Sequence, residues 1–150
     1  IHTNEAASVP IRLMELGIEP YLVASSLAGV LAQRLVRMIC PGCKTAYAPS
    51  DADRALYRDA GLPDPAEQLY RGTGCASCEG SGYMGRSGIF EVLDVTRPLR
   101  ELIEQRPSAE RIRDEARKQG MIDMKTAGLI RAAEGITTLD EVRRLVPAGD

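Results

Sequence analysis

The spacing of apolar residues along the chain predicts a series of short helices and few strands. The first helix is predicted for residues 4–16, with Asn4 as its cap and Gly17 as its end. Its apolar face consists of Val9, Leu13 and Leu16. Pro10 conflicts with a helix interior, because proline removes a hydrogen bond and clashes with the preceding turn. This helix therefore either begins near Ser8 or is kinked.

A second helix is predicted from Pro20 to Met38. Proline suits the first helical position, because its missing N–H has no partner there. Apolar residues then recur at three- and four-residue intervals, at Leu22, Val23, Leu27, Val30, Leu31, Leu35 and Met38. Arg34 and Arg37 fall in the last turns, where cations suit the helix dipole.

The middle of the chain predicts shorter elements separated by turns. Ser50 or Asp51 caps a short helix through residues 53–57, and strands are expected at 68–70 and 89–93. Glycine occupies positions 72, 74, 80, 82, 85 and 88. Such a density of glycine indicates tight turns or close approach of the backbone.

The last third of the chain is predicted to be helical. The predicted helices begin near Pro98, at the cap Ser108, near Met124 and at Leu139. Thr138 and Glu141 have the spacing of a capping box for the last helix, residues 139–146. We therefore expect an α+β chain that is mainly α-helical and ends in a small helical bundle.

Composition excludes several classes of function. The 150 residues are 44% hydrophobic and 27% charged, with a net charge of −2, so the chain is expected to fold without a basic surface for nucleic acid. No tryptophan and one phenylalanine leave no aromatic platform for bases. No apolar run reaches the roughly 18–20 residues that span a bilayer. We expect neither a nucleic-acid partner nor a membrane span.

The four cysteines form two pairs of identical spacing. They are Cys40, Cys43, Cys75 and Cys78, which is C-x2-C, 31 intervening residues and C-x2-C. Two such turns supply the four thiolates of a tetrahedral zinc site. An all-cysteine site leaves no open position for water, so the pattern predicts one structural Zn²⁺ per chain.

Two other readings of the cysteines stay open at this point. A redox dithiol at Cys40–Cys43 would leave the second pair unexplained, and it lacks a βαβ context. Inert buried thiols are the other possibility. Disulfides are disfavoured, because nothing marks the chain as secreted.

With these motifs placed, the sequence resembles the C-terminal part of the ATPases that drive type II secretion and type IV pilus assembly. The resemblance rests on His2-Thr3-Asn4, on residues 17–37, on both cysteine pairs, on residues 74–91 and on residues 127–142. It covers nearly the whole chain, with the motifs in the family's order.

The resemblance implies a fold and site residues. Residues 1–39 would complete a RecA-like ATPase core, 40–95 would form a tetracysteine zinc-binding subdomain, and 96–150 a C-terminal helical subdomain. His2 would belong to the family's His box, on a strand near the terminal phosphate of the nucleotide. Arg86, in its glycine-flanked loop, would contact the nucleotide or a neighbouring subunit, although a plain surface arginine is an equal expectation.

The resemblance also implies partners: other subunits of a homohexamer, and cytoplasmic domains of inner-membrane secretion or pilus platform proteins. The protein would be cytoplasmic and peripheral to the inner membrane. No G-x4-G-K-[S/T] motif occurs in this sequence, so the loop that would bind ATP and Mg²⁺ is expected in a longer parent protein. The chain alone is expected not to hydrolyse ATP.

Two further functions stay open. The run from Cys75 to Gly82 also fits the C-x2-C-x-G-x-G knuckle of DnaJ-type co-chaperones, which bind unfolded proteins, but only one full copy is present. A dithiol oxidoreductase is the other alternative, and it would require free cysteines of low pKa.

Overall fold

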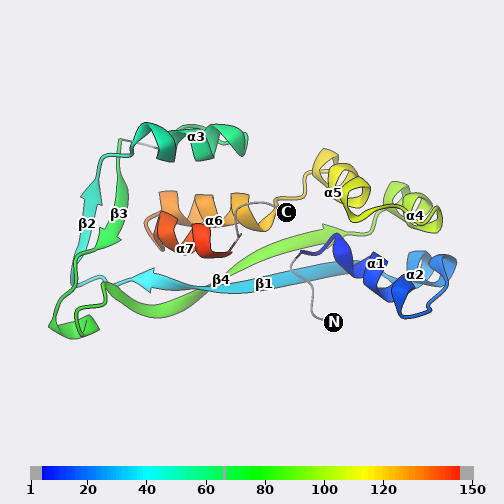
Figure 1. Ribbon diagram of the computed structural model, residues 1–150, viewed down its shortest axis with the longest axis horizontal. Helices are drawn as coiled ribbons and strands as arrows, with labels where there is room; N and C mark the ends of the chain where they lie inside the picture. Colours follow the sequence, from blue (N-terminus) through cyan, green and yellow to red (C-terminus); the bar gives the residue numbers. More distant parts are fainter. Residues whose placement is uncertain (1–4, 66, 146–150) are drawn as a thin grey trace. The chain divides into compact units, whose positions relative to one another are not determined.

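The computed structural model describes residues 5–65 and 67–145 (Figure 1). These residues form two compact units, and each unit combines stretches that are far apart in the sequence. The first unit contains the described residues up to Gln33 together with 90–123, and the second contains 34–89 together with those from Met124 onward. The predicted α+β class is confirmed.

The first unit is built mainly from helices. They are α1 (Ser8–Glu15), α2 (Pro20–Ser26), α4 (Arg97–Glu104) and α5 (Ala109–Lys118). Helix α2 packs against α4, and α4 packs against α5. The core consists of Ala6, Ala7, Val23, Ala24, Leu93, Val95, Leu99, Ile103, Ile112 and Ala116. Burial of these apolar faces holds the unit together.

The second unit joins a small sheet to three helices. Strands β2 (Lys44–Tyr47) and β3 (Leu69–Gly72) pair antiparallel, with Lys44 opposite Gly72 and Tyr47 opposite Leu69. The helices are α3 (Asp51–Asp59), α6 (Met124–Ala133) and α7 (Leu139–Leu145). The core of this unit consists of Tyr57, Leu69, Leu129, Ala132, Leu139 and Val142.

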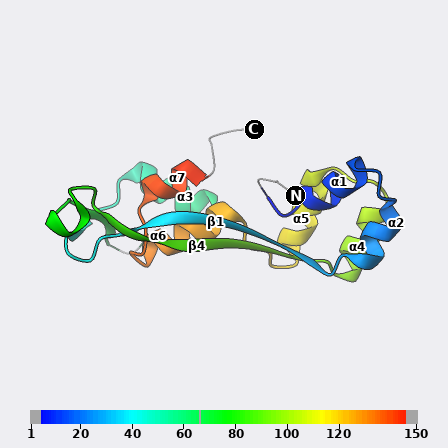
Figure 2. The same cartoon turned by 90° about the horizontal axis from the view of Figure 1, so that it is seen from below.

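Two longer strands, β1 (Gly29–Ile39) and β4 (Tyr83–Asp94), pair with each other and run side by side in both views (Figures 1 and 2). The amide of Val95 donates to the carbonyl of Ala28 next to one end of the pair. The amide of Cys40 donates to the carbonyl of Gly82 next to the other end. The two strands are therefore antiparallel.

The predicted helix from Pro20 to Met38 is wrong beyond Ser26. Residues 29–39 form strand β1 instead, and their exposure alternates from Val30 to Val36, as on a strand with one covered face. The apolar positions fit a helical and an alternating pattern equally well, so β4 decides between them. That partner lies more than 40 residues later in the sequence, outside the reach of local periodicity.

The first predicted helix begins at Ser8, which is one of the two alternatives that Pro10 left open. Helix α1 starts at Ser8, so Pro10 lies in its first turn, where it interrupts no helical hydrogen bond, and its side chain is buried. Gly17 follows the helix with a φ of +90°, a left-handed conformation that favours glycine. The predicted cap Asn4, and the strand that the resemblance implies around His2, lie outside the described residues.

The other predicted elements are present. Ser50 caps α3 in a reciprocal capping box with Asp53, and the hydroxyl of Ser108 accepts from the amide of Arg111 at the start of α5. Strand β4 is longer than the predicted strand at 89–93, because it extends back to Tyr83. None of the helices in the described part of the chain has the length and hydropathy of a membrane-spanning segment.

The four helices that follow β4 are divided between the units. Helices α4 and α5 belong to the first unit, and α6 and α7 to the second. The divisions at 1–39, 40–95 and 96–150, the RecA-like core and the C-terminal bundle stay predictions about the assembled protein, because compact units describe packing within this chain.

Candidate metal centre

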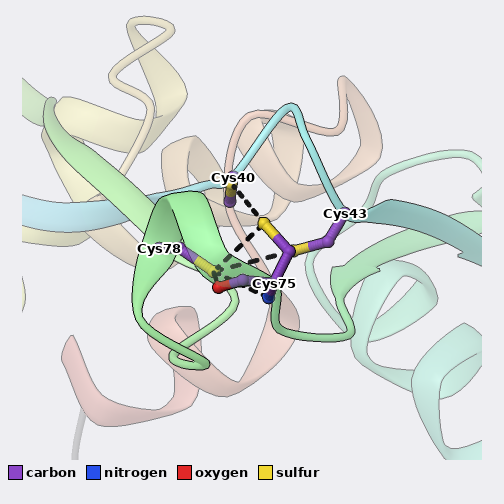
Figure 3. A group of neighbouring side chains, drawn as sticks. All are labelled: Cys40, Cys43, Cys75 and Cys78. Carbon is purple, nitrogen blue, oxygen red and sulfur yellow. Dashed lines mark hydrogen bonds between the residues drawn. The ribbon is translucent and has the colours of Figure 1, made fainter.

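Two tight turns of the second unit present the four cysteines to one point (Figure 3). Cys40 directly follows β1 and Cys43 directly precedes β2, while Cys75 and Cys78 belong to the turn between β3 and β4. In each turn the amide of the second cysteine donates to the carbonyl of the first at 3.3 Å. The identical spacing of the two pairs therefore produces the same local geometry twice.

Glycines allow the two turns to approach. A Cβ atom on Gly72 would lie 2.0 Å from the carbonyl oxygen of Gly82, and one on Gly82 would lie 2.6 Å from that of Gly72. Gly82 also has a φ of +78°. The glycine-rich run from residue 72 is therefore required where the end of β3 passes the start of β4.

The sulfur positions match a tetrahedral metal site. The Sγ atoms of Cys40 and Cys75 are 3.9 Å apart, those of Cys43 and Cys78 are 3.9 Å apart, and those of Cys75 and Cys78 are 3.7 Å apart. All four lie within 4.8 Å of one another. A zinc ion with Zn–S bonds of about 2.3 Å requires sulfur–sulfur edges of about 3.8 Å. The donor set fits zinc in number, chemistry and spacing.

Backbone amides surround the sulfur atoms. Cys78 Sγ accepts from the amides of Cys75 and Gly82, each at 3.2 Å, and Cys43 Sγ accepts from the amide of Gly74 at 3.3 Å. The hydrogen bond from Cys75, with that from Gly82, lowers the pKa of the Cys78 thiol to about 6. Burial raises the pKa of Cys40 to about 11. A bound cation would shift this balance towards four thiolates, because it stabilises their charge.

The cluster is suited to a structural role. The Sγ atoms of Cys40 and Cys75 are 3.9 Å apart and those of Cys75 and Cys78 are 3.7 Å apart, far beyond the roughly 2.05 Å of a disulfide. Cys40 and Cys78 are buried, and the other two cysteines are half-buried. Four protein ligands fill a tetrahedral coordination shell, which leaves no position for a reacting water.

The other two predicted site residues are not part of this cluster. His2 lies outside the described residues, so its predicted role is not tested. Arg86 lies on β4 and its side chain is exposed. Among the described residues it makes no ion pair, so a nucleotide or subunit contact stays a prediction.

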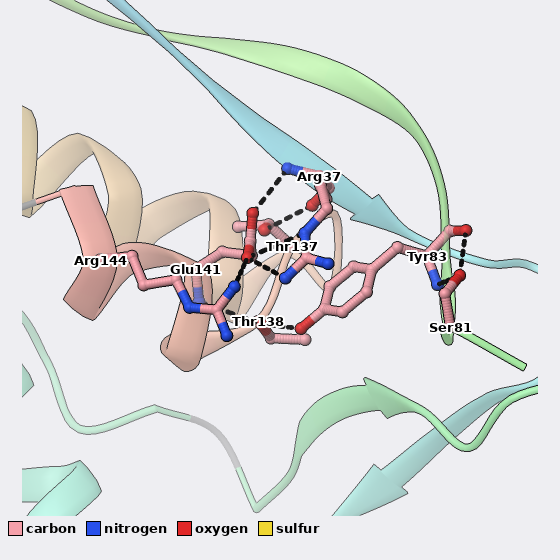
Figure 4. A network of polar contacts seen from close by, with 7 residues as sticks. All are labelled: Arg37, Ser81, Tyr83, Thr137, Thr138, Glu141 and Arg144. Atoms are coloured by element: carbon pink, nitrogen blue, oxygen red, sulfur yellow. Dashed lines mark hydrogen bonds and ion pairs between the residues drawn. The ribbon is translucent and has the colours of Figure 1, made fainter.

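A polar network that sequence reasoning missed lies in the same unit (Figure 4). The carboxylate of Glu141, on α7, accepts from the backbone amide of Arg37 at 2.9 Å and from its guanidinium at 2.6 and 3.0 Å. The guanidinium lies 4.1 Å from the ring centre of Tyr83, whose hydroxyl contacts that of Thr138 at 2.9 Å. The network joins β1 and β4 to the start of α7.

Only part of this network had a signal in the sequence. The predicted cap at Thr138 is present, because its hydroxyl accepts from the amide of Glu141. The carboxylate that a capping box directs to the cap residue goes instead to Arg37, on β1. Its partner is 104 residues away, a separation that no local motif encodes.

Comparison with known proteins gives one consistent family. The sequence model described as "Type II/IV secretion system protein" matches residues 1–144. Type IV pilus assembly ATPase TfpB of Acinetobacter baylyi is 42% identical over 151 residues, which cover 98% of this chain and 25% of that protein.

Two further relatives agree. Type IV pilus assembly ATPase PilB of Thermus thermophilus is 43% identical over 95% of this chain and 16% of its own length. Type II secretion system ATPase E of Vibrio cholerae is 43% identical over 97% of this chain and 28% of its own length. This chain thus spans between 16% and 28% of the length of these relatives. With its family model matched over 144 residues, the chain belongs to the type II/IV secretion system protein family.

Proposed function

We propose that this chain is the C-terminal part of a hexameric ATPase that converts ATP hydrolysis into motion of a type II secretion or type IV pilus machine. The observation that carries the proposal is the match of residues 1–144 to the family. It is supported by relatives named as ATPases of both machines, which share about 40% identity with nearly the whole chain.

The four cysteines have a structural role in this function. One Zn²⁺ is held by Cys40, Cys43, Cys75 and Cys78, in support of which the sulfur separations lie at 3.7–3.9 Å. Structural zinc contributes on the order of 10–16 kcal/mol of apparent binding free energy near neutral pH, which is also folding free energy. The ion stabilises the turns between β1, β2, β3 and β4, and takes no part in the hydrolysis of ATP.

In the assembled enzyme, the segment up to residue 39 completes a RecA-like core and the helices after residue 95 form a bundle beside the zinc lobe. ATP and Mg²⁺ bind to motifs of the longer parent, His2 senses the terminal phosphate, and Arg86 contacts the nucleotide or the next subunit. The hexamer engages cytoplasmic domains of inner-membrane platform proteins, and it is therefore cytoplasmic and peripheral to that membrane.

Three measurements on two proteins test this function. The full-length protein that carries this sequence is expected to hydrolyse ATP with Mg²⁺ and to sediment as a hexamer. The 150-residue chain alone is expected to show no turnover above a buffer blank, because it has no phosphate-binding G-x4-G-K-[S/T] loop. Turnover by the pure chain that chelation of Mg²⁺ abolishes would contradict its predicted inactivity, and a full-length protein without ATPase activity would contradict the function itself.

A further inference from the structure

The turn between α6 and α7, residues 134–138, contacts the strands that lead into the cysteine cluster. The amide of Ile39, directly before the first cysteine, donates to the carbonyl of Ile136 at 2.9 Å. The hydroxyl of Thr137, which has no exposed surface, donates to the carbonyl of Arg37 at 2.8 Å. The end of β1 is therefore hydrogen-bonded twice to this α6–α7 turn.

The start of β4 contacts the same turn through Tyr83. Its hydroxyl lies 2.9 Å from that of Thr138 (Figure 4). Tyr83 directly follows Gly82, whose amide donates to Cys78 Sγ at 3.2 Å and whose carbonyl accepts from the amide of Cys40 at 3.0 Å. Tyr83 is thus next to a residue that contacts both cysteine pairs.

A third contact comes from the start of β2. Lys44 directly follows Cys43, and its Nζ lies 4.4 Å from the ring centre of Tyr70. A Cβ atom on Gly135 would lie 2.6 Å from this Nζ and 2.7 Å from Cδ2 of the ring. The two side chains therefore lie directly against the α6–α7 turn, and all of these contacts are within the second unit.

The start of α7 depends on the residues that these contacts fix. The hydroxyl of Thr138 accepts from the amide of Glu141 at 3.2 Å, and the carboxylate of Glu141 accepts from the amide of Arg37 at 2.9 Å. Helix α7 has seven residues, and so short a helix is not stable on its own. Its stability must come from tertiary contacts such as these.

We propose that metal binding at the cysteine cluster holds α7 in place through the α6–α7 turn, so that loss of the metal releases this helix. The ion ties the two cysteine turns together, and the residues beside those turns fix residues 134–138. Coupling of this kind is reciprocal, so contacts at the turn must also strengthen metal binding. The inference rests on the zinc ion of the proposed function, but not on ATP hydrolysis.

Amide hydrogen exchange of the full-length protein, with and without a strong zinc chelator, tests the first direction. Zinc removal is expected to speed exchange at residues 134–145 by about tenfold, the factor that loss of one or two hydrogen bonds produces. Exchange in α3 is expected to stay unchanged. That helix has its own capping box, and Tyr57 binds it to the carbonyl of Leu129 on α6.

Zinc affinity, measured by competition with a chromophoric chelator, tests the reciprocal direction. Thr137→Val and Tyr83→Phe each remove one hydroxyl at similar shape, and each is expected to weaken zinc binding by about threefold to tenfold. Tyr70→Phe is the matched control, because that hydroxyl bonds to the exposed side chain of Gln68 and the ring under Lys44 is kept. It is expected to bind zinc like the wild type.

A second control separates this coupling from general destabilisation of the unit. Tyr57→Phe removes a buried hydrogen bond of the same unit that does not involve the α6–α7 turn, and it is expected to leave zinc affinity unchanged. If Thr137→Val does not fold, Tyr83→Phe decides, because Tyr83 is only half-buried.

The outcomes distinguish this inference from the proposed function. Equal weakening of zinc binding by Tyr57→Phe and Thr137→Val, or equal loss of protection in α3 and α7, would show that the ion stabilises the whole unit alike and would overturn the coupling. Unchanged exchange in α7 after zinc removal would also overturn it, and both results leave the proposed function intact. A protein that binds no zinc would overturn the metal site and this inference together.

Discussion

The carboxylate of Glu141 shows how one side chain can join segments that are distant in the sequence. The side chain is 9% exposed and binds both the backbone and the guanidinium of Arg37. The sequence predicts that Thr138 and Glu141 lie at a helix start, and they do. The sequence does not predict that Arg37 is the partner of Glu141. The local sequence around Arg37 predicts a helix, whereas the pairing of β1 with β4 places it on a strand.

Glu141→Gln is predicted to destabilise the protein by about 1–2 kcal/mol at pH 7, because it removes the charge that Arg37 pairs with. The loss is no larger than this because the Arg37 side chain is 40% exposed, and solvent weakens the ion pair. Burial raises the pKa of Glu141, but Arg37 outweighs this and holds it below the ordinary value of 4.5. The stabilisation is therefore complete above pH 4.5 and is lost as the pH falls through that lowered pKa.

Urea unfolding of both proteins at pH 7 and at pH 3 measures this effect. The difference between wild type and Glu141→Gln is expected to shrink at pH 3. Glu15→Gln is the matched control, because Arg12 and Glu15 are each 55% exposed and their pair is worth less than about 0.5 kcal/mol. A difference that stays the same at both pH values would contradict the role of the Glu141 charge.

A second buried contact at this scale links two helices. The hydroxyl of Tyr57, on α3, donates to the carbonyl of Leu129, on α6, at 2.9 Å, and burial raises the pKa of Tyr57 to about 12, which keeps the donor proton in place. Tyr57→Phe is predicted to cost about 1 kcal/mol in thermal or urea unfolding. Tyr21→Phe is the control, because Tyr21 is 61% exposed. Equal stability of the two variants would show that the hydrogen bond contributes nothing.

At the scale of elements, local signals were sufficient where a residue acts on its own segment. Ser50 and Ser108 predict helix starts, and Pro10 requires the first helix either to begin near Ser8 or to kink. The structure has helices that begin at Ser8, Asp51 and Ala109. Local signals failed for residues 29–39, where the choice between helix and strand depends on a partner strand. The periodicity of apolar residues indicates which side of a segment is buried. Tertiary contacts decide whether the backbone of that segment is helical or extended.

The contact between the end of β3 and the start of β4 gives a prediction at this scale. Gly82→Ala is predicted to destabilise the second unit and weaken zinc retention, because the new methyl group would lie 2.6 Å from the carbonyl of Gly72. Gly80→Ala is the matched control: its φ of +77° is nearly that of Gly82, yet nothing lies within 4 Å of the new methyl group.

Thermal unfolding and zinc content of the two variants measure the difference. Gly80→Ala is expected to lose about 1 kcal/mol from its left-handed backbone alone, and Gly82→Ala about 1–3 kcal/mol more. Equal losses in both variants would mean that the close approach of Gly72 and Gly82 is not required.

At the scale of the whole molecule, the four cysteines were the most informative part of the sequence. Their identical spacing predicts one closed cluster, and the structure brings all four sulfur atoms within 4.8 Å. The two compact units were not predictable, because each is assembled from segments separated by more than 30 residues. The hydrogen bond from the amide of Ala6 to the carboxylate of Glu91 could not be predicted for the same reason.

A structural zinc ion bound to the four cysteines is expected to stabilise the second unit. The protein, purified without added metal, is predicted to carry one zinc ion per chain by native mass spectrometry with elemental analysis. Removal of the ion by a strong chelator is predicted to lower the melting temperature, and Cys40→Ser is predicted to do the same without chelator. A protein that contains no zinc, and whose melting temperature does not change with chelator or in Cys40→Ser, would contradict the claim.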